Sequence, residues 1–313
     1  MQEEVIISGR NIPNIDPNLE IWHWPIPVYL FLGGLAAGIL FFTAYVTIRG
    51  KEKEFPTAVK GATFIAPIAL VVGLIALFID LKHQAYFWRL YTTIRIESPM
   101  SWGAWVLLFI TPLSMVWCAS LMTDIFPKWD WKFSLLKKFD RWVKNNKLLL
   151  AWPMLFLALI LGIYTGILLS AFNARPLWNN ALLGPLFLTS GLSTGAATIM
   201  WLSKQKEEKR FFSKMDLILI GIEIFFIIHL FMGFLAGPSV QLDAAAMFIS
   251  GKYALPFWGL VVGLGLILPA ILETLELRGK KIPAFLPASL ILVGGFIFRY
   301  IMVEAGQLSS YPY

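Results

Sequence analysis

Eight long apolar runs alternate with short polar segments along this chain of 313 residues. Each run holds about twenty or more residues, the length that an α-helix needs to cross a hydrocarbon core of about 30 Å. The runs cover residues 26–48, 61–80, 102–123, 148–172, 181–202, 216–236, 254–275 and 284–303. This pattern predicts an all-α, polytopic membrane protein. We expect one integral membrane domain over residues 1–313, with eight transmembrane helices in two four-helix halves.

The overall composition agrees with a chain that lies in a bilayer. Hydrophobic residues make up 58% of the sequence and charged residues 14%, whereas ordinary soluble domains are about 45–50% apolar and about 25% charged. These values exclude a soluble globular enzyme and a disordered chain. No loop is long enough for a soluble catalytic domain, so any catalytic head is expected in a partner chain.

Lysine and arginine are distributed unevenly between the two sides of the predicted bilayer. The loops 49–60, 124–147, 203–215 and 276–283 contain 19 of the 26 basic residues, and the N-terminal segment, the other loops and the tail contain 6. Basic residues favour cytoplasmic loops, so both termini are expected on the outer (periplasmic) side. The net charge of +7 is then a topology signal, and no nucleic-acid partner is expected.

The longest loop, 124–147, combines large apolar side chains with lysines. The apolar members are Trp129, Trp131, Phe133, Leu136, Phe139 and Trp142. This mixture predicts a helix that lies in the cytoplasmic interface of the lipid bilayer.

Two short segments rich in small residues resemble each other. Residues 33–38 read Gly-Gly-Leu-Ala-Ala-Gly, and residues 190–195 read Ser-Gly-Leu-Ser-Thr-Gly. Both contain two glycines four positions apart, a spacing that lets membrane helices approach closely. The match weakly supports two related halves, and repeats of this kind also occur in transporters.

Polar residues inside or beside the apolar runs are the candidates for function, because ionisable groups in a membrane are costly. The predicted orientation places one group towards the outer side: His23, Asp80, His83, Tyr164, Arg175, His229 and Arg299. Glu223 and Glu273 lie in the inner half. Ordinary alternatives exist for each, such as interfacial anchoring of Asp80 or a hydrogen-bonded core role for His229. Glu223 and Arg299 each need a partner or water.

A quinone site would explain the outer group. Oxidation of a quinol removes two electrons and two protons, so its site needs an apolar pocket, a polar group at each oxygen and a proton exit. His23 and Tyr164 suit the two oxygens, because a histidine accepts a proton near neutral pH. Asp80 and Glu20 are candidates for outward relay. Glu223, His229, Glu273 and Arg299 are candidates for a proton route from the inner side.

Few residues in this chain are suited to metal cofactors. The single cysteine, Cys118, excludes an all-cysteine iron–sulfur cluster, and three histidines are too few for two bis-histidine haems. No metal site is predicted. A single haem b held by His83 and His229 remains an alternative without support from their spacing. A second alternative is an ion or small-molecule transporter that uses Glu223, Glu273 and Arg299.

Five motifs resemble the NrfD-like family, the membrane subunits of polysulfide reductase and related respiratory complexes. In chain order they are residues 22–38 (WHWPIPVYLFLGGLAAG), 98–103 (SPMSWG), 162–166 (GIYTG), 175–178 (RPLW) and 294–307, which begins GGFIFRY and ends AGQ. They occur in the family's order from residue 22 to residue 307.

The resemblance implies an eight-helix, haem-free subunit that binds menaquinone or ubiquinone in the cytoplasmic (inner) membrane of a prokaryote. It also implies a ferredoxin-like iron–sulfur partner on the outer face and, in many members, a molybdopterin catalytic subunit beyond it. His23 and Tyr164 match the family's quinone ligands. The family's asparagine three residues before the histidine is replaced by Glu20, and Asn18 is the alternative. Asp80 resembles the family's acidic residue at the end of the second helix.

Overall fold

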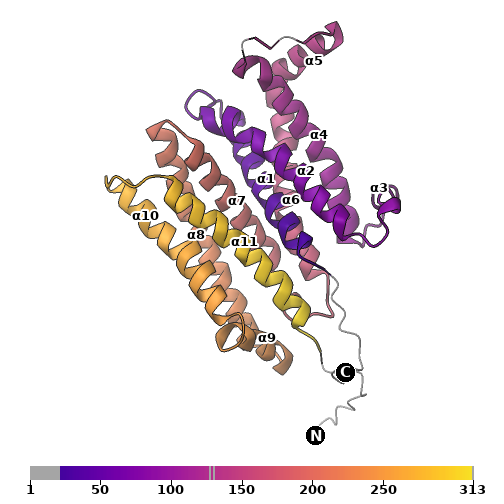
Figure 1. The fold of residues 1–313 in the computed structure, drawn as a ribbon, viewed down its shortest axis with the longest axis vertical. Coiled ribbons are helices and arrows are strands. Elements are labelled where there is room, and N and C mark those ends of the chain that lie inside the picture. The colour runs from indigo at the N-terminus through magenta and orange to yellow at the C-terminus, as the bar shows by residue number, and fades with distance from the viewer. Residues whose placement is uncertain (1–21, 127, 130, 312–313) are drawn as a thin grey trace.

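The chain forms an elongated bundle of helices that run along one long axis (Figure 1). The computed structural model describes residues 22–126, 128–129 and 131–311, and every regular element in them is helical. The long helices are α1 (Pro25–Ile48), α2 (Ile65–Asp80), α4 (Pro99–Ile125), α6 (Lys147–Ser170), α7 (Leu183–Leu202), α8 (Lys206–Leu235) and α11 (Phe285–Leu308). The shorter elements are η1 (Thr57–Gly61), η2 (Ala62–Phe64), η3 (Gln84–Tyr86), α3 (Arg89–Thr92), α5 (Ser134–Asn145), α9 (Ser239–Ile249), η4 (Pro256–Ile267) and α10 (Leu268–Leu277).

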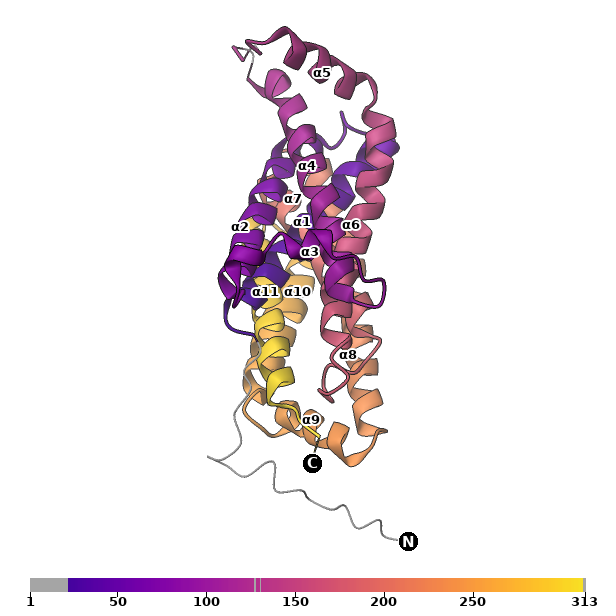
Figure 2. The same cartoon turned by 90° about the vertical axis from the view of Figure 1, so that its right-hand side faces the viewer.

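The two ends of the bundle carry different segments. One end holds the turn after α1, helix α5, the turn before α8 and the turn after α10, and we call it the basic end (Figures 1 and 2). The opposite end holds the start of α1, the end of α11, and helices α3 and α9, and we call it the terminal end. The basic loops of the sequence therefore share one end of the molecule.

Seven helices in the described residues are long and apolar enough to cross a membrane: α1, Thr57–Asp80, α4, α6, α8, Pro256–Leu277 and α11. Together with the family membership established below, they identify a multi-pass membrane protein. The remaining predicted span corresponds to α7, which is rich in glycine, serine and threonine and is largely buried. Its neighbours are α1, α6, α8 and α11, so it lies inside the bundle.

Helices α1 and α7 are central, and they cross with their backbones in contact. A Cβ atom on Gly38 would lie 2.2 Å from the carbonyl oxygen of Gly191, and one on Gly195 would lie 2.5 Å from the carbonyl carbon of Gly38. Only hydrogen fits at these positions, as the glycine spacing predicted. Around this crossing, α1 also packs against α2, α6 and α11, while α7 packs against α8 and α11.

Two predicted spans correspond to longer or irregular helices. The span 216–236 lies within α8, which begins earlier, at Lys206; Glu208 in its first turn is buried and accepts hydrogen bonds from Ala58 N (2.9 Å) and Ser203 Oγ (2.7 Å). The predicted span 254–275 is a wide π-helix, η4, followed by α10. Pro269 is the second residue of α10, directly after the π-helix ends, and it has no backbone N–H to donate to the preceding turn.

The loop 124–147 contains the predicted helix. Helix α5 lies across the bundle axis at the basic end (Figure 2). Val143 is buried against the bundle, whereas Leu135 and Phe139 are exposed. Lys144 ties α5 to the end of α4 through Asp124 Oδ1, at 2.8 Å.

Candidate functional site

Three of the sequence motifs meet at the terminal end. The backbone of Trp22 exchanges two hydrogen bonds with the side chain of Gln307, at 2.7 and 2.8 Å. The indole of Trp22 packs on that of Trp178, with centroids 5.1 Å apart, and Trp178 Nε1 donates to Met302 O at 2.8 Å. Gly306 provides the space, because a Cβ there would lie 1.7 Å from Trp178 Nε1. These contacts fix the chain just before His23.

His23 and Asp80 form a hydrogen-bonded pair at the terminal end. His23 Nδ1 lies 3.1 Å from Asp80 Oδ1, and the backbone N–H of His23 donates to the same oxygen at 3.3 Å. The His23 side chain is 58% exposed, whereas that of Asp80 is only 7% exposed. The carboxylate therefore orients an imidazole whose other nitrogen, Nε2, remains available to a ligand.

Tyr164 lies in a group of three tyrosines. Its ring packs directly on the backbone of α4 at Gly103, where a Cβ would lie 1.9 Å from Tyr164 Cζ. The Tyr29 hydroxyl lies near those of Tyr164 and Tyr91, and it is buried without a hydrogen-bond partner. Burial raises the pKa of Tyr91, which lies in the segment between α2 and α4, so its hydroxyl stays protonated as a donor.

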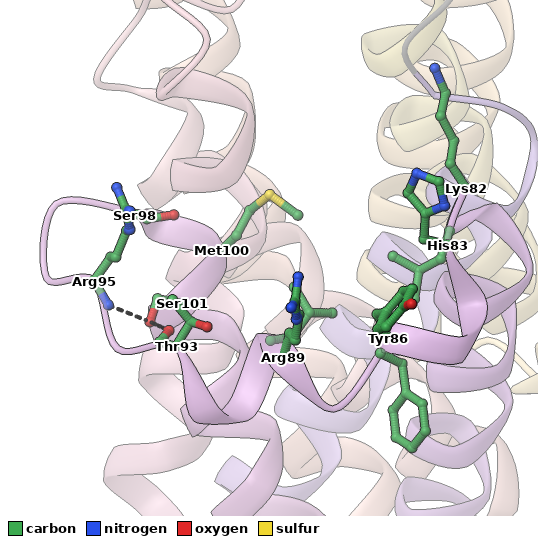
Figure 3. A pocket seen from close by; sticks show the side chains of 12 residues that line it. Lys82, His83, Tyr86, Arg89, Thr93, Arg95, Ser98, Met100 and Ser101 are labelled. Carbon is green, nitrogen blue, oxygen red and sulfur yellow. Dashed lines mark hydrogen bonds between the residues drawn. The ribbon is translucent and has the colours of Figure 1, made fainter.

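Two cavities lie along the segment between α2 and α4, and Tyr91 lines the first of them. The apolar pocket, of about 300 Å³, is lined by the C-terminal half of α2 and by the segment after it: Val71, Leu74, Ile75, Leu77, Phe78, Leu81, Phe87, Leu90 and Tyr91. The basic pocket, of about 540 Å³, shares three of these residues and opens between α2, α3 and α4. In Figure 3, Lys82 and His83 stand on one side of the basic pocket and Arg95 and Ser101 on the other, with Arg89 between them. The two pockets are therefore adjacent, one with an apolar lining and the other with basic side chains in its lining.

A second polar group surrounds Arg299 in the middle of the bundle. Arg299 is fully buried and donates through Nη1 to Ser190 Oγ (3.2 Å) and Gly295 O (2.8 Å). A Cβ on Gly34 would lie 2.8 Å from its Nη2, so the glycine leaves room for the guanidinium. Glu223 interacts electrostatically with Arg299 and with Ser190. The buried guanidinium and the Glu223 carboxyl group therefore belong to one polar cluster inside the bundle.

A carboxyl pair lies between this group and the basic end. Asp216 on α8 and Glu273 on α10 are both fully buried, and they interact with each other. Ser193 Oγ donates to Asp216 Oδ1 at 2.6 Å. A small cavity lies between Ser193 and Glu223.

The other predicted residues lie apart from these groups. His229 is exposed on α8, with Nδ1 2.8 Å from the carbonyl oxygen of Phe225 on its own helix. Arg175 binds Ser309 O at 3.0 Å and so holds the end of the chain. Glu20 and Asn18 lie outside the described residues. Among the described residues, no group of three or more His, Cys, Asp or Glu lies together as a metal site would require.

Sequence reasoning missed Asp216, Tyr29 and Tyr91. Asp216 stood at a predicted helix boundary, where an aspartate is ordinary; only the extra length of α8 places it inside the bundle. Tyr29 carried a signal within the motif 22–38, but tyrosines are common near membrane interfaces. Tyr91 lies in a loop, and only the fold brings it to Tyr29.

Comparison with known proteins identifies the family. Residues 13–310 match the family model described as "Polysulphide reductase, NrfD". The chain is 31% identical to protein NrfD of Escherichia coli over 307 residues, covering 92% of this chain and 96% of the relative. It is also 31% identical to one of the chains of polysulfide reductase from Wolinella succinogenes (93% and 95% covered). Its identity to one of the subunits of selenate reductase from Mesobacillus selenatarsenatis is 24% (90% and 73% covered). The chain therefore belongs to the NrfD family of polysulphide reductase membrane proteins.

Proposed function

We propose that this protein is the quinone-binding membrane subunit of a respiratory oxidoreductase complex. It exchanges electrons between the menaquinone or ubiquinone pool and an iron–sulfur partner. The observation that carries the proposal is the terminal-end site. The His23–Asp80 pair lies there at the end of α2, and Tyr91, whose hydroxyl lies near that of Tyr29, lines an apolar pocket formed mainly by α2. Two of the relatives are named as parts of a polysulfide reductase and a selenate reductase, and these names support a role in such a complex.

The residues of this site fit a quinone. The apolar pocket suits a hydrocarbon tail, and the buried, unpartnered Tyr29 hydroxyl leaves a polar group for a head group. When bound, the quinone supplies the two-electron, two-proton chemistry. His23 Nε2 accepts a proton, Asp80 stabilises the resulting imidazolium, and Tyr164 donates a hydrogen bond to an oxygen. Glu20 and Asn18 remain candidates for the second oxygen.

The topology of the proposed subunit has eight membrane crossings, with α7 as the crossing that is shielded from lipid. Spans one to four and five to eight form two four-helix halves that meet at the α1–α7 crossing. We place the basic end in the cytoplasm and both termini outside, in the cytoplasmic membrane of a prokaryote. The distribution of 19 basic residues against 6 supports this orientation.

The proposed partners lie on the outer face. A ferredoxin-like iron–sulfur subunit docks at the terminal end, near the quinone site, and the complex is completed by a molybdopterin catalytic subunit. This chain itself holds neither haem nor iron–sulfur cluster. Proton translocation through Glu223, Glu273 and Arg299 is part of the proposal, with Asp80 on the outer side. His229 lies on the exposed face of α8, apart from these three residues.

The test is binding of a quinone analogue to the purified complex. We expect His23→Ala and Tyr164→Phe to weaken binding while the complex stays assembled, and Tyr300→Phe, at an exposed position on α11, to have no effect. Unchanged binding in both site variants would move the site elsewhere.

A second candidate function is an ion or small-molecule transporter, favoured by the buried Glu223, Glu273 and Arg299. A transporter would retain uptake in vesicles that contain this chain alone. Purification only with iron–sulfur partners, and no uptake by the lone chain, would refute it.

A further inference from the structure

Buried carboxyl groups form a series that begins at the basic end. Glu276 lines a cavity of about 620 Å³ there, together with Lys206, Arg210, Lys280 and Lys281. Glu273 lies one turn deeper on the same helix, and it interacts with both Glu276 and Asp216. The series therefore connects an accessible surface with the interior of the bundle.

Three of the four carboxyl oxygens of the Asp216–Glu273 pair lack a hydrogen-bond donor. Asp216 Oδ1 accepts from Ser193, but Asp216 Oδ2 and both carboxyl oxygens of Glu273 are buried with no hydrogen-bond partner. The other charged groups that act on the pair are Glu223 and Glu276, which are also acidic; Lys209 acts on Glu276 alone. Two ionised carboxylates side by side in this interior would be prohibitively unstable.

A proton on the pair removes this conflict. It neutralises one carboxyl and provides the donor that the facing oxygens lack, so the two groups share a hydrogen bond. No other described side chain supplies that donor, since Ser193 is the one hydroxyl that contacts the pair.

The series continues past Ser193 towards the middle of the membrane. A buried cavity of about 10 Å³, close to the least that one water molecule requires, is lined by Ser190, Ser193 and Glu223. Ser190 contacts both Glu223 and Arg299. Four helices, α7, α8, α10 and α11, thus contribute side chains to one continuous polar path.

We infer that Asp216 and Glu273 together bind one proton taken up from the basic end through Glu276, and that Ser193 and the small cavity pass it to Glu223. The transfer of the proton to Glu223 rests on the proposed function, because it is a step of proton translocation. The binding of a proton by Asp216 and Glu273 does not rest on it. The step moves a proton between oxygen atoms and needs no oxidant or reductant.

The first experiment measures the proton directly, without quinone. Infrared spectra of the purified complex at neutral pH are expected to show a protonated-carboxyl band that is lost in Asp216→Asn and in Glu273→Gln. Asp243→Asn, at an exposed position on α9, is the control and should keep the band. Ser193→Ala, which keeps both carboxyls, should shift the band rather than remove it. A band that is unchanged in Asp216→Asn, Glu273→Gln and Ser193→Ala would overturn the inference.

The second experiment separates this inference from the proposed function. In proteoliposomes, quinol oxidation and proton uptake at the basic end are recorded together. Asp216→Asn should lose the uptake and retain electron transfer. Loss of neither would overturn the translocation step, and absence of quinol oxidation in wild type would refute the proposed function while leaving the infrared result to stand. A carboxyl band that appears only when sodium is removed would show that the pair binds a cation instead and would also overturn the inference.

Discussion

The position of Tyr164 depends on the absence of a side chain at Gly103, and this dependence is open to test. In Gly103→Ala the new Cβ would lie 1.9 Å from Tyr164 Cζ and 2.2 Å from its hydroxyl oxygen. Carbon atoms need about 3.5 Å, so the ring must move by about 1.5 Å. Tyr164 lies on a buried face of α6, and the ring moves more easily than the backbone of α4.

The displacement has a calculable effect on quinone binding. A shift of this size breaks a hydrogen bond from the Tyr164 hydroxyl, because bonds of about 2.8 Å weaken steeply with distance. A neutral hydrogen bond contributes about 0.5–1.5 kcal/mol, so the Kd of a quinone analogue should rise about 2- to 12-fold. Gly103→Ala and Tyr164→Phe remove the same interaction, so the double variant should bind about as weakly as either single variant.

Titration of the purified complex with a quinone analogue provides the measurement. Gly221→Ala is the matched control, because a Cβ there meets no atom within 4 Å. Wild-type affinity in Gly103→Ala, or effects that add in the double variant, would refute the reasoning.

Three further predictions concern other parts of the molecule. Asp80→Asn keeps an acceptor oxygen beside His23 but removes the negative charge that would stabilise the imidazolium, so we expect slower quinol oxidation with the complex intact, measured as kcat; an unchanged kcat would contradict the proposed role of the pair. Gly195→Ala places a Cβ 2.5 Å from Gly38 C, so the Tm in detergent should fall, and a Tm as high as that of Gly221→Ala would contradict the contact. Burial raises the pKa of Tyr253 to about 12, which favours the neutral phenol in the folded state. The neutral phenol then stabilises the fold below about pH 10, and this stabilisation is lost as the pH rises towards 12. In an ultraviolet titration, the difference in phenolate absorbance between wild type and Tyr253→Phe should stay near zero until the pH approaches 12; a difference that appears near pH 10 would contradict the burial.

Local sequence patterns predicted the helices well. Apolar runs have a length set by the bilayer, and glycine spacing indicates close approach of helices, so α1 and the tight packing at residues 33–38 and 190–195 were predicted. That these two segments pack on each other was not. Helix α8 extends ten residues before the predicted span 216–236, and the buried contacts of Glu208 with Ala58 and Ser203 in this added part had no hydrophobic pattern to indicate them. The π-helix η4 could not be predicted, because its hydrophobic pattern does not differ from that of an α-helical membrane span.

The candidate sites depend on contacts that no local pattern contains. The pairing of His23 with Asp80 joins residues 57 positions apart, and that of Arg299 with Ser190 joins residues 109 apart. Sequence marked these side chains as unusual, but it did not show which of them meet. Asp216 shows the same limit, because its partner Glu273 lies on another helix.

The glycine contact between α1 and α7 constrains how the molecule moves. Side chains that separate two helices can change conformation as the helices shift past each other. At Gly38, Gly191 and Gly195 no side chain separates the backbones of α1 and α7. Translation along the helix axes would drive the Gly191 carbonyl into the backbone at Gly38, whereas rotation about the crossing keeps the contact. Arg299 lies beside this pivot at Gly34 and is displaced little by such rotation. The ends of the bundle move the furthest in such a rotation, so it would open or close the proposed quinone site at the terminal end while the buried guanidinium stays in place.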